Sequence, residues 1–278
     1  MPPVVSCFTN SYLRFGAKAA IEHLRATGLE NLELAIRTEG KPSFFKDEPI
    51  VTDRSSLAEL KDVQQQIDRA GLTVTSCNVT SANPLAPENV TVIKQKLDRA
   101  AHFGVDRVVG AAGELEDESQ RETLYAHLRE IGDHAAKLGI IHCFETHPGI
   151  CVNHREMLRT IEELDHPQLR LNFDTGNIHY YNRHIDGEVA LAKVCHYVEH
   201  VHLKDSSGEF EDWDFAELGS GGAVNFVRVR ELMSNCGFQG PYSLELEGIG
   251  DEDPQPVEVY QQRIANSVKR LHEWGYFS

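Results

Sequence analysis

The sequence predicts a (β/α)8 barrel that forms a single domain over residues 1–278. Eight short apolar runs recur at roughly even intervals, and helical patterns lie between them. Several helical patterns end in a glycine directly before the next apolar run, as in Leu138-Gly139-Ile140, which is typical of a helix C-cap followed by a strand. Regular alternation of this kind, without a break in composition, predicts a parallel sheet closed into one barrel.

The eight strand candidates are rich in β-branched and aliphatic residues, as expected for strands that are buried on both faces. They are Val4–Phe8, Leu32–Arg37, Leu72–Val79, Arg107–Ala111, Ile140–Glu145, Leu169–Asp174, His200–Lys204 and Tyr242–Glu247.

The helix candidates carry apolar residues at the spacing of a helical face. Pro87–Phe103 begins with proline at a first helical position, and Gly104 follows its end. A doubly wound open sheet is the rival architecture, but the segment after the first strand lacks a glycine-rich phosphate loop. The predicted helices are Ser55–Ala70, Pro87–Phe103, Glu118–Leu138, His154–Leu164, Gly187–Tyr197, Phe226–Cys236 and Val257–Trp274.

Two segments are long for connections within a barrel. Thr38–Thr52 follows the second predicted strand, and Asp205–Ala223 follows the seventh. Loops that follow the C-terminal ends of barrel strands lie over the active-site face. We therefore expect both segments to act as lids above a site.

Composition excludes several classes of function. The formal net charge of −16 argues against nucleic acid as a partner, because phosphate binding needs an excess of Lys and Arg. The same charge argues against an anionic membrane surface. The first residues lack the basic and apolar regions of a signal peptide, and no run approaches the length of a membrane span. These features predict a cytoplasmic protein.

The six cysteines are scattered, without a CxxC motif. Three of them, Cys7, Cys77 and Cys143, lie inside predicted strands, which favours buried reduced thiols over a disulfide framework. The others are Cys151, Cys195 and Cys236.

Four consecutive strands, the fifth to the eighth, end on a side chain that can bind a metal. These side chains are Glu145, Asp174, His202 and Glu245. Taken singly, each has an ordinary interpretation: a helix cap, an Asx turn, a structural histidine and the polar face of a strand. Together they fall where barrel strands converge, and buried carboxylates must be paired or coordinate a metal. Carboxylate oxygens with one imidazole therefore predict a divalent-cation site.

The motifs around these residues resemble those of the xylose isomerase-like TIM-barrel superfamily over nearly the whole chain, most closely from residue 140 onward. They are ETH at 145–147, NFDTGN at 172–177, HVHLKD at 200–205, FAELG at 215–219 and GFQGPYSLE at 237–245. The superfamily contains sugar and sugar-phosphate isomerases and epimerases, inosose and dehydroshikimate dehydratases, and endonuclease IV.

The resemblance implies one Mn, Mg, Co or Zn ion held by Glu145, Asp174, His202 and Glu245. In the ketose epimerase branch, the two glutamates are also the acid/base pair, which implies catalytic roles for Glu145 and Glu245. His200 shares a strand face with His202, and Glu247 shares one with Glu245. The family pattern favours the earlier glutamate, five residues after Gly240, and His202, which is nearer the end of its strand.

The sequence departs from particular branches of the superfamily. Epimerases similar to the tagatose and psicose enzymes carry a histidine three residues after the metal aspartate, where this chain has Asn177. They also carry an arginine six residues after the metal histidine, where this chain has Gly208. Endonuclease IV has a histidine-rich site for three metals, which this sequence lacks. These differences argue against a ketohexose epimerase and against an endonuclease.

Further polar residues near the strand ends are candidates for contact with a substrate. His147 lies two residues past Glu145 and is predicted to be catalytic, orienting a substrate oxygen or carrying a proton. The ordinary interpretation of each of the others is a loop or helix-cap residue. The predicted substrate-binding residues are Arg37, Asn78, Asn177, His179 and Lys204.

The predicted reaction is proton transfer beside a carbonyl of a small carbohydrate. A divalent cation would stabilise an enediolate while one group removes the α-proton and another returns it. We expect an isomerase or epimerase of a sugar or sugar phosphate. A dehydratase of a keto-cyclitol, 3-keto sugar or dehydroshikimate-like substrate is the first alternative, and a non-catalytic sugar-binding barrel is the second. The sequence leaves a homo-oligomeric state open.

Overall fold

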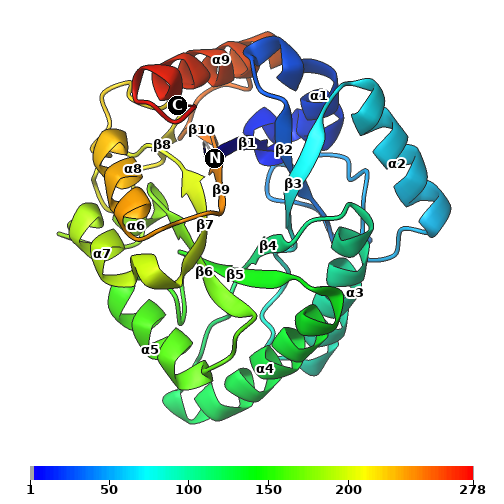
Figure 1. Ribbon diagram of the computed structural model, residues 1–278, viewed down its shortest axis with the longest axis vertical. Coiled ribbons are helices and arrows are strands. Elements are labelled where there is room, and N and C mark those ends of the chain that lie inside the picture. Colours follow the sequence, from blue (N-terminus) through cyan, green and yellow to red (C-terminus); the bar gives the residue numbers. More distant parts are fainter. Residues whose placement is uncertain (1–2, 278) are drawn as a thin grey trace.

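A closed barrel of eight parallel strands forms the centre of the computed structural model, which describes residues 3–277 (Figure 1). The strand order around the barrel is β1-β2-β3-β4-β5-β6-β7-β9, and β9 pairs with β1 to close it. The predicted (β/α)8 fold is therefore confirmed. The strands are β1 (Val4–Phe8), β2 (Asn31–Ala35), β3 (Thr73–Asn78), β4 (Arg107–Gly110), β5 (Ile141–Glu145), β6 (Leu169–Asp174), β7 (Val198–Leu203) and β9 (Pro241–Leu244).

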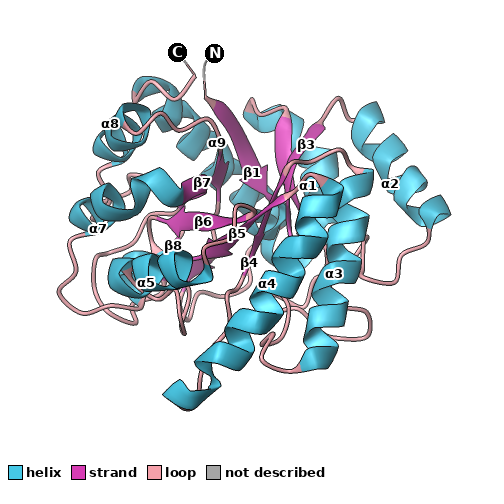
Figure 2. Ribbon diagram, turned by 60° about the horizontal axis from the view of Figure 1, so that its bottom comes forward, coloured by secondary structure: helices cyan, strands magenta, loops and turns pink. Residues whose placement is uncertain are grey.

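Helices surround the barrel on its outer side (Figures 1 and 2). All seven predicted helices are present, with shifts of a few residues at most ends and short 3-10 turns at two of them. They are α2 (Leu57–Arg69), α3 (Pro87–His102), η3 (Glu118–Gln120) leading into α4 (Arg121–Leu138), α5 (His154–Leu164), α7 (Gly187–Val194) leading into η4 (Cys195–Tyr197), α8 (Phe226–Asn235) and α9 (Val257–Glu273).

Local capping chemistry explains where several helices begin and end. Ser56 and Glu59 form a reciprocal capping box at the start of α2. The side chain of Asn153 accepts hydrogen bonds from two backbone amides at the start of α5. Gly139 ends α4 in the left-handed conformation (φ 69°), which an L side chain rarely adopts.

The segment between β1 and β2 contains helical structure that the sequence analysis did not predict. It consists of η1 (Thr9–Phe15), α1 (Gly16–His23) and η2 (Leu24–Thr27). A short α6 (Asn177–Tyr180) also follows β6. These elements are four to eight residues long, so helical periodicity is weak in their sequences.

The last predicted strand, Tyr242–Glu247, is too long, because the chain leaves the barrel after Leu244. Beyond that point Glu247 donates its backbone amide to the carbonyl of Phe215. A two-stranded antiparallel sheet follows, formed by β8 (Asp214–Phe215) and β10 (Gly248–Ile249). This small sheet ties the loop after β7 to the loop after β9.

Apolar and polar residues divide between the two faces of the barrel strands. The layer between strands and helices is apolar and includes Leu171, Val201 and Leu244. The inward face is fully buried yet polar, with Ser6, Ser76 and Ser243 and the following polar or charged side chains: Glu33, Asn172, Asp174, His200 and His202. Because buried polar groups need partners, this interior indicates a hydrogen-bonded or metal-binding network.

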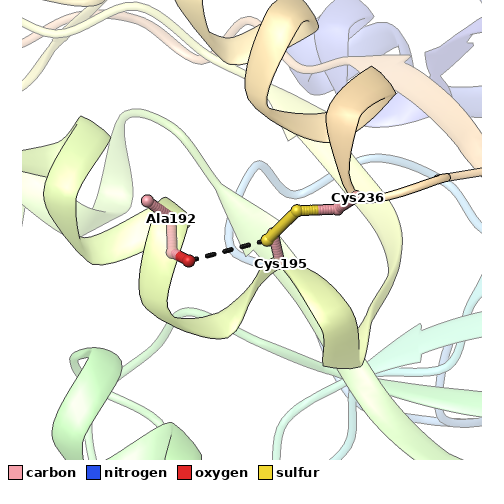
Figure 3. The surroundings of a disulfide bond; sticks show 3 residues. All are labelled: Ala192, Cys195 and Cys236. Atoms are coloured by element: carbon pink, nitrogen blue, oxygen red, sulfur yellow. Dashed lines mark hydrogen bonds between the residues drawn. A yellow bond between two sulfur atoms is a disulfide. The ribbon is translucent and has the colours of Figure 1, made fainter.

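Cys195 and Cys236 form a disulfide that joins η4 to the end of α8 (Figure 3). Cys195 Sγ also lies 3.6 Å from the carbonyl oxygen of Ala192. The prediction of reduced thiols is therefore wrong for this pair, because the barrel brings together two residues 41 positions apart that no sequence motif links. It is confirmed for the four remaining cysteines, which are buried and free: Cys7, Cys77, Cys143 and Cys151.

Across residues 3–277, none of the helices combines the length and the apolar character that a membrane crossing requires.

Candidate metal centre and substrate cavity

The four predicted metal ligands converge at the C-terminal ends of adjacent strands. Glu145, Asp174 and His202 lie at or near the ends of β5, β6 and β7, and Glu245 is the first residue after β9. Strand register aligns them, because Asp174 pairs with His202. One ligand atom from each residue lies within 4.8 Å of all the others, and all four side chains are buried. The barrel therefore brings together the four side chains that the sequence singled out.

His202 presents its Nδ1 to the carboxylates. This atom lies 3.3 Å from Glu145 Oε1, 3.2 Å from Glu245 Oε2 and 3.8 Å from Asp174 Oδ2. Burial alone would lower the pKa of His202, but the charges of Glu33 and Glu245 outweigh it and hold that pKa well above its ordinary value. The imidazole therefore lies in a strongly negative environment that favours any positive charge placed there.

Asp174 and Glu245 each have one buried oxygen without a hydrogen-bond partner among residues 3–277. These atoms are Asp174 Oδ2 and Glu245 Oε2, and the ammonium of Lys204 lies 3.4 Å and 3.0 Å from them. Burial raises the pKa of Asp174 to about 6, although Lys204 opposes the rise. Burial would also raise the pKa of Glu245, but Lys204 and His202 outweigh it and hold that pKa below its ordinary value.

This arrangement fits a divalent cation. Among residues 3–277, Lys204 and His202 are the positive groups that contact the three buried carboxylates, and together they offset only part of the negative charge. Unpaired buried charge is costly, and a cation bound between the oxygens would remove much of that cost. Oxygen donors with one imidazole suit Mg, Mn, Co or Zn. The other oxygen of Asp174 is already used, since it accepts the backbone amides of Gly176 and Asn177.

A cavity of ≈ 780 Å³ opens above this group, and Glu145 and Glu245 form part of its wall. The two long loops predicted as lids both contribute to it. Phe44 from the first loop stacks on Trp213 from the second, with ring centroids 5.3 Å apart. Trp213 is held in turn by the hydrogen bond that its Nε1 donates to the carbonyl of Glu247. Aromatic walls with a few polar groups are typical of a site for a small polar molecule.

Four of the five predicted substrate-binding residues line this cavity: Arg37, Asn78, Asn177 and Lys204. Lys204 is buried, and its Nζ donates to Asn177 Oδ1 at 3.2 Å and to Glu247 Oε2 at 2.7 Å. Arg37 is held by Asp47 at 2.8 Å and by Asn10 at 2.5 Å.

His147 and His179 occupy different places. His147 lines the cavity, as predicted, and its Nε2 lies 3.3 Å from the hydroxyl of Tyr181. His179 lines a separate cavity of ≈ 380 Å³ together with Ile185 and Asp186. The structure therefore does not place His179 beside the four candidate ligands, because the short helix α6 turns its side chain toward the start of α7.

Three residues of the site were not singled out by the sequence. Tyr181 lines the cavity and contacts His147, but it lies beyond a helix that the sequence did not predict. Glu247 is paired with Lys204, and burial raises its pKa to about 7. Strand alternation had placed it on the same face as Glu245, which was a usable signal. Glu33 contacts His202 from inside the barrel. The only signal in its sequence is a charge in the middle of an apolar strand.

The fold and the site define a parallel barrel with a cluster of potential metal ligands at the C-terminal ends of its strands. The family model described as "Xylose isomerase-like TIM barrel" matches residues 21–269, so the chain belongs to that family. A curated relative, the L-ribulose-5-phosphate 3-epimerase UlaE of Escherichia coli, is 35% identical over 101 residues. That match covers 36% of this chain and 33% of the relative, so the chain spans about a third of the length of the relative that it matches.

Solved structures share the fold over nearly the whole chain at low sequence identity. A xylose isomerase-like TIM-barrel protein from Mycobacterium smegmatis in complex with magnesium has a TM-score of 0.74 at 17% identity, covering 99% of this chain and 98% of that one. An L-ribulose 3-epimerase has a TM-score of 0.75 at 14% identity, covering 99% and 94%. A probable 3-DHS dehydratase from Bacillus anthracis has a TM-score of 0.68 at 16% identity, covering 97% and 98%.

Proposed function

We propose that this protein is a divalent-metal-dependent isomerase or epimerase that acts on a sugar or sugar phosphate. The observation that carries the proposal is the convergence of Glu145, Asp174, His202 and Glu245 within 4.8 Å beside a cavity of ≈ 780 Å³. The family match and the partial similarity to a ribulose-phosphate epimerase support the same class of reaction.

Glu145 and Glu245 are the proposed acid and base as well as ligands. A bound divalent cation would polarise the substrate carbonyl and so acidify the neighbouring C–H bond. One carboxylate takes the proton from that carbon, and the other group returns a proton to a different face or to the neighbouring carbon. Both glutamates reach the cavity wall, whereas Asp174 lies deeper and has one oxygen tied to the backbone. That difference supports proton transfer by the glutamates and a purely ligating role for Asp174.

Residues around the cavity are proposed to hold the hydroxyl groups of the substrate. Asn78, Asn177, Arg37 and Lys204 present amide or cationic groups to the space above the metal site. His147 is proposed to orient a substrate oxygen or carry a proton, with Tyr181 fixing its ring. We propose no contact between His179 and the substrate, because His179 lines the other cavity.

A dehydratase is the second candidate, and the environment of Asn177 favours it. Epimerases similar to the tagatose and psicose enzymes carry a histidine at that position. Here an amide occupies it and binds Lys204. If no group returns the proton to carbon, loss of the β-hydroxyl as water completes an elimination. Similarity of fold to a probable 3-DHS dehydratase is consistent with this alternative.

Metal content and product analysis test the proposal together. Purified protein should bind one Mn²⁺ per chain, and the Asp174→Ala variant should lose it. Turnover would then be measured by NMR across ketoses, pentulose phosphates, keto-inositols and dehydroshikimate. Isomer formation supports the first candidate, and loss of water supports the second. Absence of metal binding by the wild-type protein, or full occupancy of the variant, would refute the proposed site.

Isotope exchange separates the two glutamates. In D2O, the wild type should exchange the α-proton of its substrate, and Glu145→Gln or Glu245→Gln should slow that exchange by about 100-fold or more. Each variant must first be shown to retain metal. Exchange at the wild-type rate in one variant would make that glutamate a ligand only.

A further inference from the structure

Glu33 is a fully buried carboxylate on β2, on the opposite side of His202 from the candidate metal ligands. It is 0% exposed. Its Oε2 and Oε1 lie 3.0 Å and 3.2 Å from His202 Nε2, the ring nitrogen that does not face Glu145 and Glu245. Both distances lie within the range of an N–H···O hydrogen bond from an imidazole to a carboxylate.

The other ring nitrogen of His202, Nδ1, faces both the carboxylates of the candidate metal site and an amide. The amide nitrogen of Asn172 lies 3.0 Å from His202 Nδ1. The amide oxygen of Asn172 lies 2.9 Å from His200 Nδ1, and this contact sets the orientation of the amide. A cation bound between the carboxylates would require an unprotonated Nδ1, to which the Asn172 amide can donate. The single imidazole proton then lies on Nε2, which donates it to Glu33.

We propose that Glu33 is a positioning residue for metal binding, which fixes the tautomer and the ring orientation of His202. By accepting the Nε2 proton, it leaves the Nδ1 lone pair directed at the space between Glu145, Asp174 and Glu245. A carboxylate in this role also raises the basicity of the ligand nitrogen. This inference rests on the proposed metal site, and it adds a residue from β2 to a cluster otherwise built from β5, β6, β7 and the segment after β9.

A second cation between Glu33, His200 and His202 is the competing interpretation, because ligand atoms of these three residues also lie within 4.8 Å of one another. The contacts of His200 argue against it. Its Nδ1 faces the amide oxygen of Asn172, and its Nε2 lies 3.0 Å from the hydroxyl of Ser76. Both nitrogens of His200 are therefore used in hydrogen bonds. Its Nε2 lies 3.5 Å from Glu33 Oε2, farther than the 3.0 Å between His202 Nε2 and the same oxygen, so His202 is the principal partner of Glu33.

The test compares Mn²⁺ affinity and stoichiometry in the wild type, Glu33→Gln and Glu33→Ala by titration calorimetry. Loss of a carboxylate partner of a metal-binding histidine typically weakens metal affinity by about 10- to 100-fold. We expect Glu33→Gln, which keeps a neutral acceptor, to weaken Mn²⁺ affinity by about 10-fold. Glu33→Ala, which keeps no acceptor, should weaken it by about 100-fold. The visible absorption spectrum of bound Co²⁺ should also change, since it reports the ligand geometry directly.

Asp53→Asn is the matched control. Asp53 is also a buried carboxylate, 2% exposed, but it accepts the backbone amide of Glu39 in the loop after β2 and contacts none of the four candidate ligands. Its variant should change thermal stability without changing the Kd for Mn²⁺.

The outcomes separate this inference from the metal site on which it rests. One Mn²⁺ per chain with graded loss of affinity in the two Glu33 variants supports it. Wild-type affinity in Glu33→Gln overturns it, even if Glu33→Ala fails to fold. Two ions in the wild type and one in Glu33→Gln would make Glu33 a ligand and overturn the positioning role. No binding by the wild type would overturn the metal site and this inference together.

Discussion

The Cys195–Cys236 disulfide is expected to make a large contribution to stability. It closes a loop with a sequence separation of 41 residues, which contains β7 with His202 and the loop that carries Trp213. In the chain-entropy model, a closed loop of that length lowers the entropy of the unfolded chain by about 13 cal/mol/K, or about 4 kcal/mol at 25 °C. Replacing both cysteines by serine should therefore lower the free energy of unfolding by about 2–4 kcal/mol.

The corresponding change in thermal midpoint follows from the size of the protein. An unfolding entropy of about 2.1 cal/mol/K per residue over the 278 residues converts this loss into a fall in Tm of roughly 3–7 °C. The assay is denaturation by guanidinium of the wild type and the Cys195→Ser/Cys236→Ser variant, each with and without dithiothreitol.

The reductant provides the control. It should destabilise the wild type to about the level of the double variant and leave the variant unchanged, because the four other cysteines are buried and free. A wild type whose stability is insensitive to the reductant, and equal to that of the variant, would show that the bond contributes nothing. Intact-mass measurement after alkylation identifies the bond independently.

Two further predictions concern histidines of β5 and the segment that follows it. His147→Gln should lower kcat/KM by about 100-fold with little change in Tm, because His147 is only half-buried and its side chain contacts Tyr181 at the cavity. A fall in Tm with unchanged turnover would assign it a structural role. Burial lowers the pKa of His142 to about 4, and its ring nitrogens lack hydrogen-bond partners among the described residues. Between pH 6.5 and pH 4 the unfolded chain therefore binds a proton that the folded protein does not, so stability is lost as the pH falls. This group alone should cost about 2 kcal/mol between pH 7 and pH 5, and guanidinium midpoints of His142→Leu should show that much less acid sensitivity than the wild type. Equal acid sensitivity of the two proteins would contradict the assignment.

Much of the fold was determined by local sequence pattern. The strands β1 and β6 and the helix α5 have the predicted bounds. In these segments the local sequence signals indicate the same secondary structure that the tertiary fold requires. The four candidate ligands could also be named from the sequence. In a barrel, the end of every strand reaches the same face, so a ligand at a strand end needs no other information to be placed.

The sequence did not predict features that depend on which distant segments become neighbours. Cys195 and Cys236 meet because η4 and α8 pack side by side on the barrel. The eighth strand ends at Leu244, and beyond it the backbone amide of Glu247 donates a hydrogen bond to the carbonyl of Phe215 in the loop after β7. Pairings of this kind depend on contacts far apart in the chain, and no local periodicity encodes them.

The same distinction separates the ligands from the residues that support them. His202 was recognisable because it ends a strand, whereas Glu33 lies within β2, 169 residues earlier, and nothing near it in the chain indicates a partner. His179 shows the converse, since its sequence position beside Asp174 suggested the active cavity and the turn of α6 directs it elsewhere. Sequence determines which strand ends carry chemistry, because strand direction alone brings them together. Only the closed barrel decides which interior side chains face each other. Those contacts depend on the register between neighbouring strands and on the orientation of side chains such as the His202 imidazole.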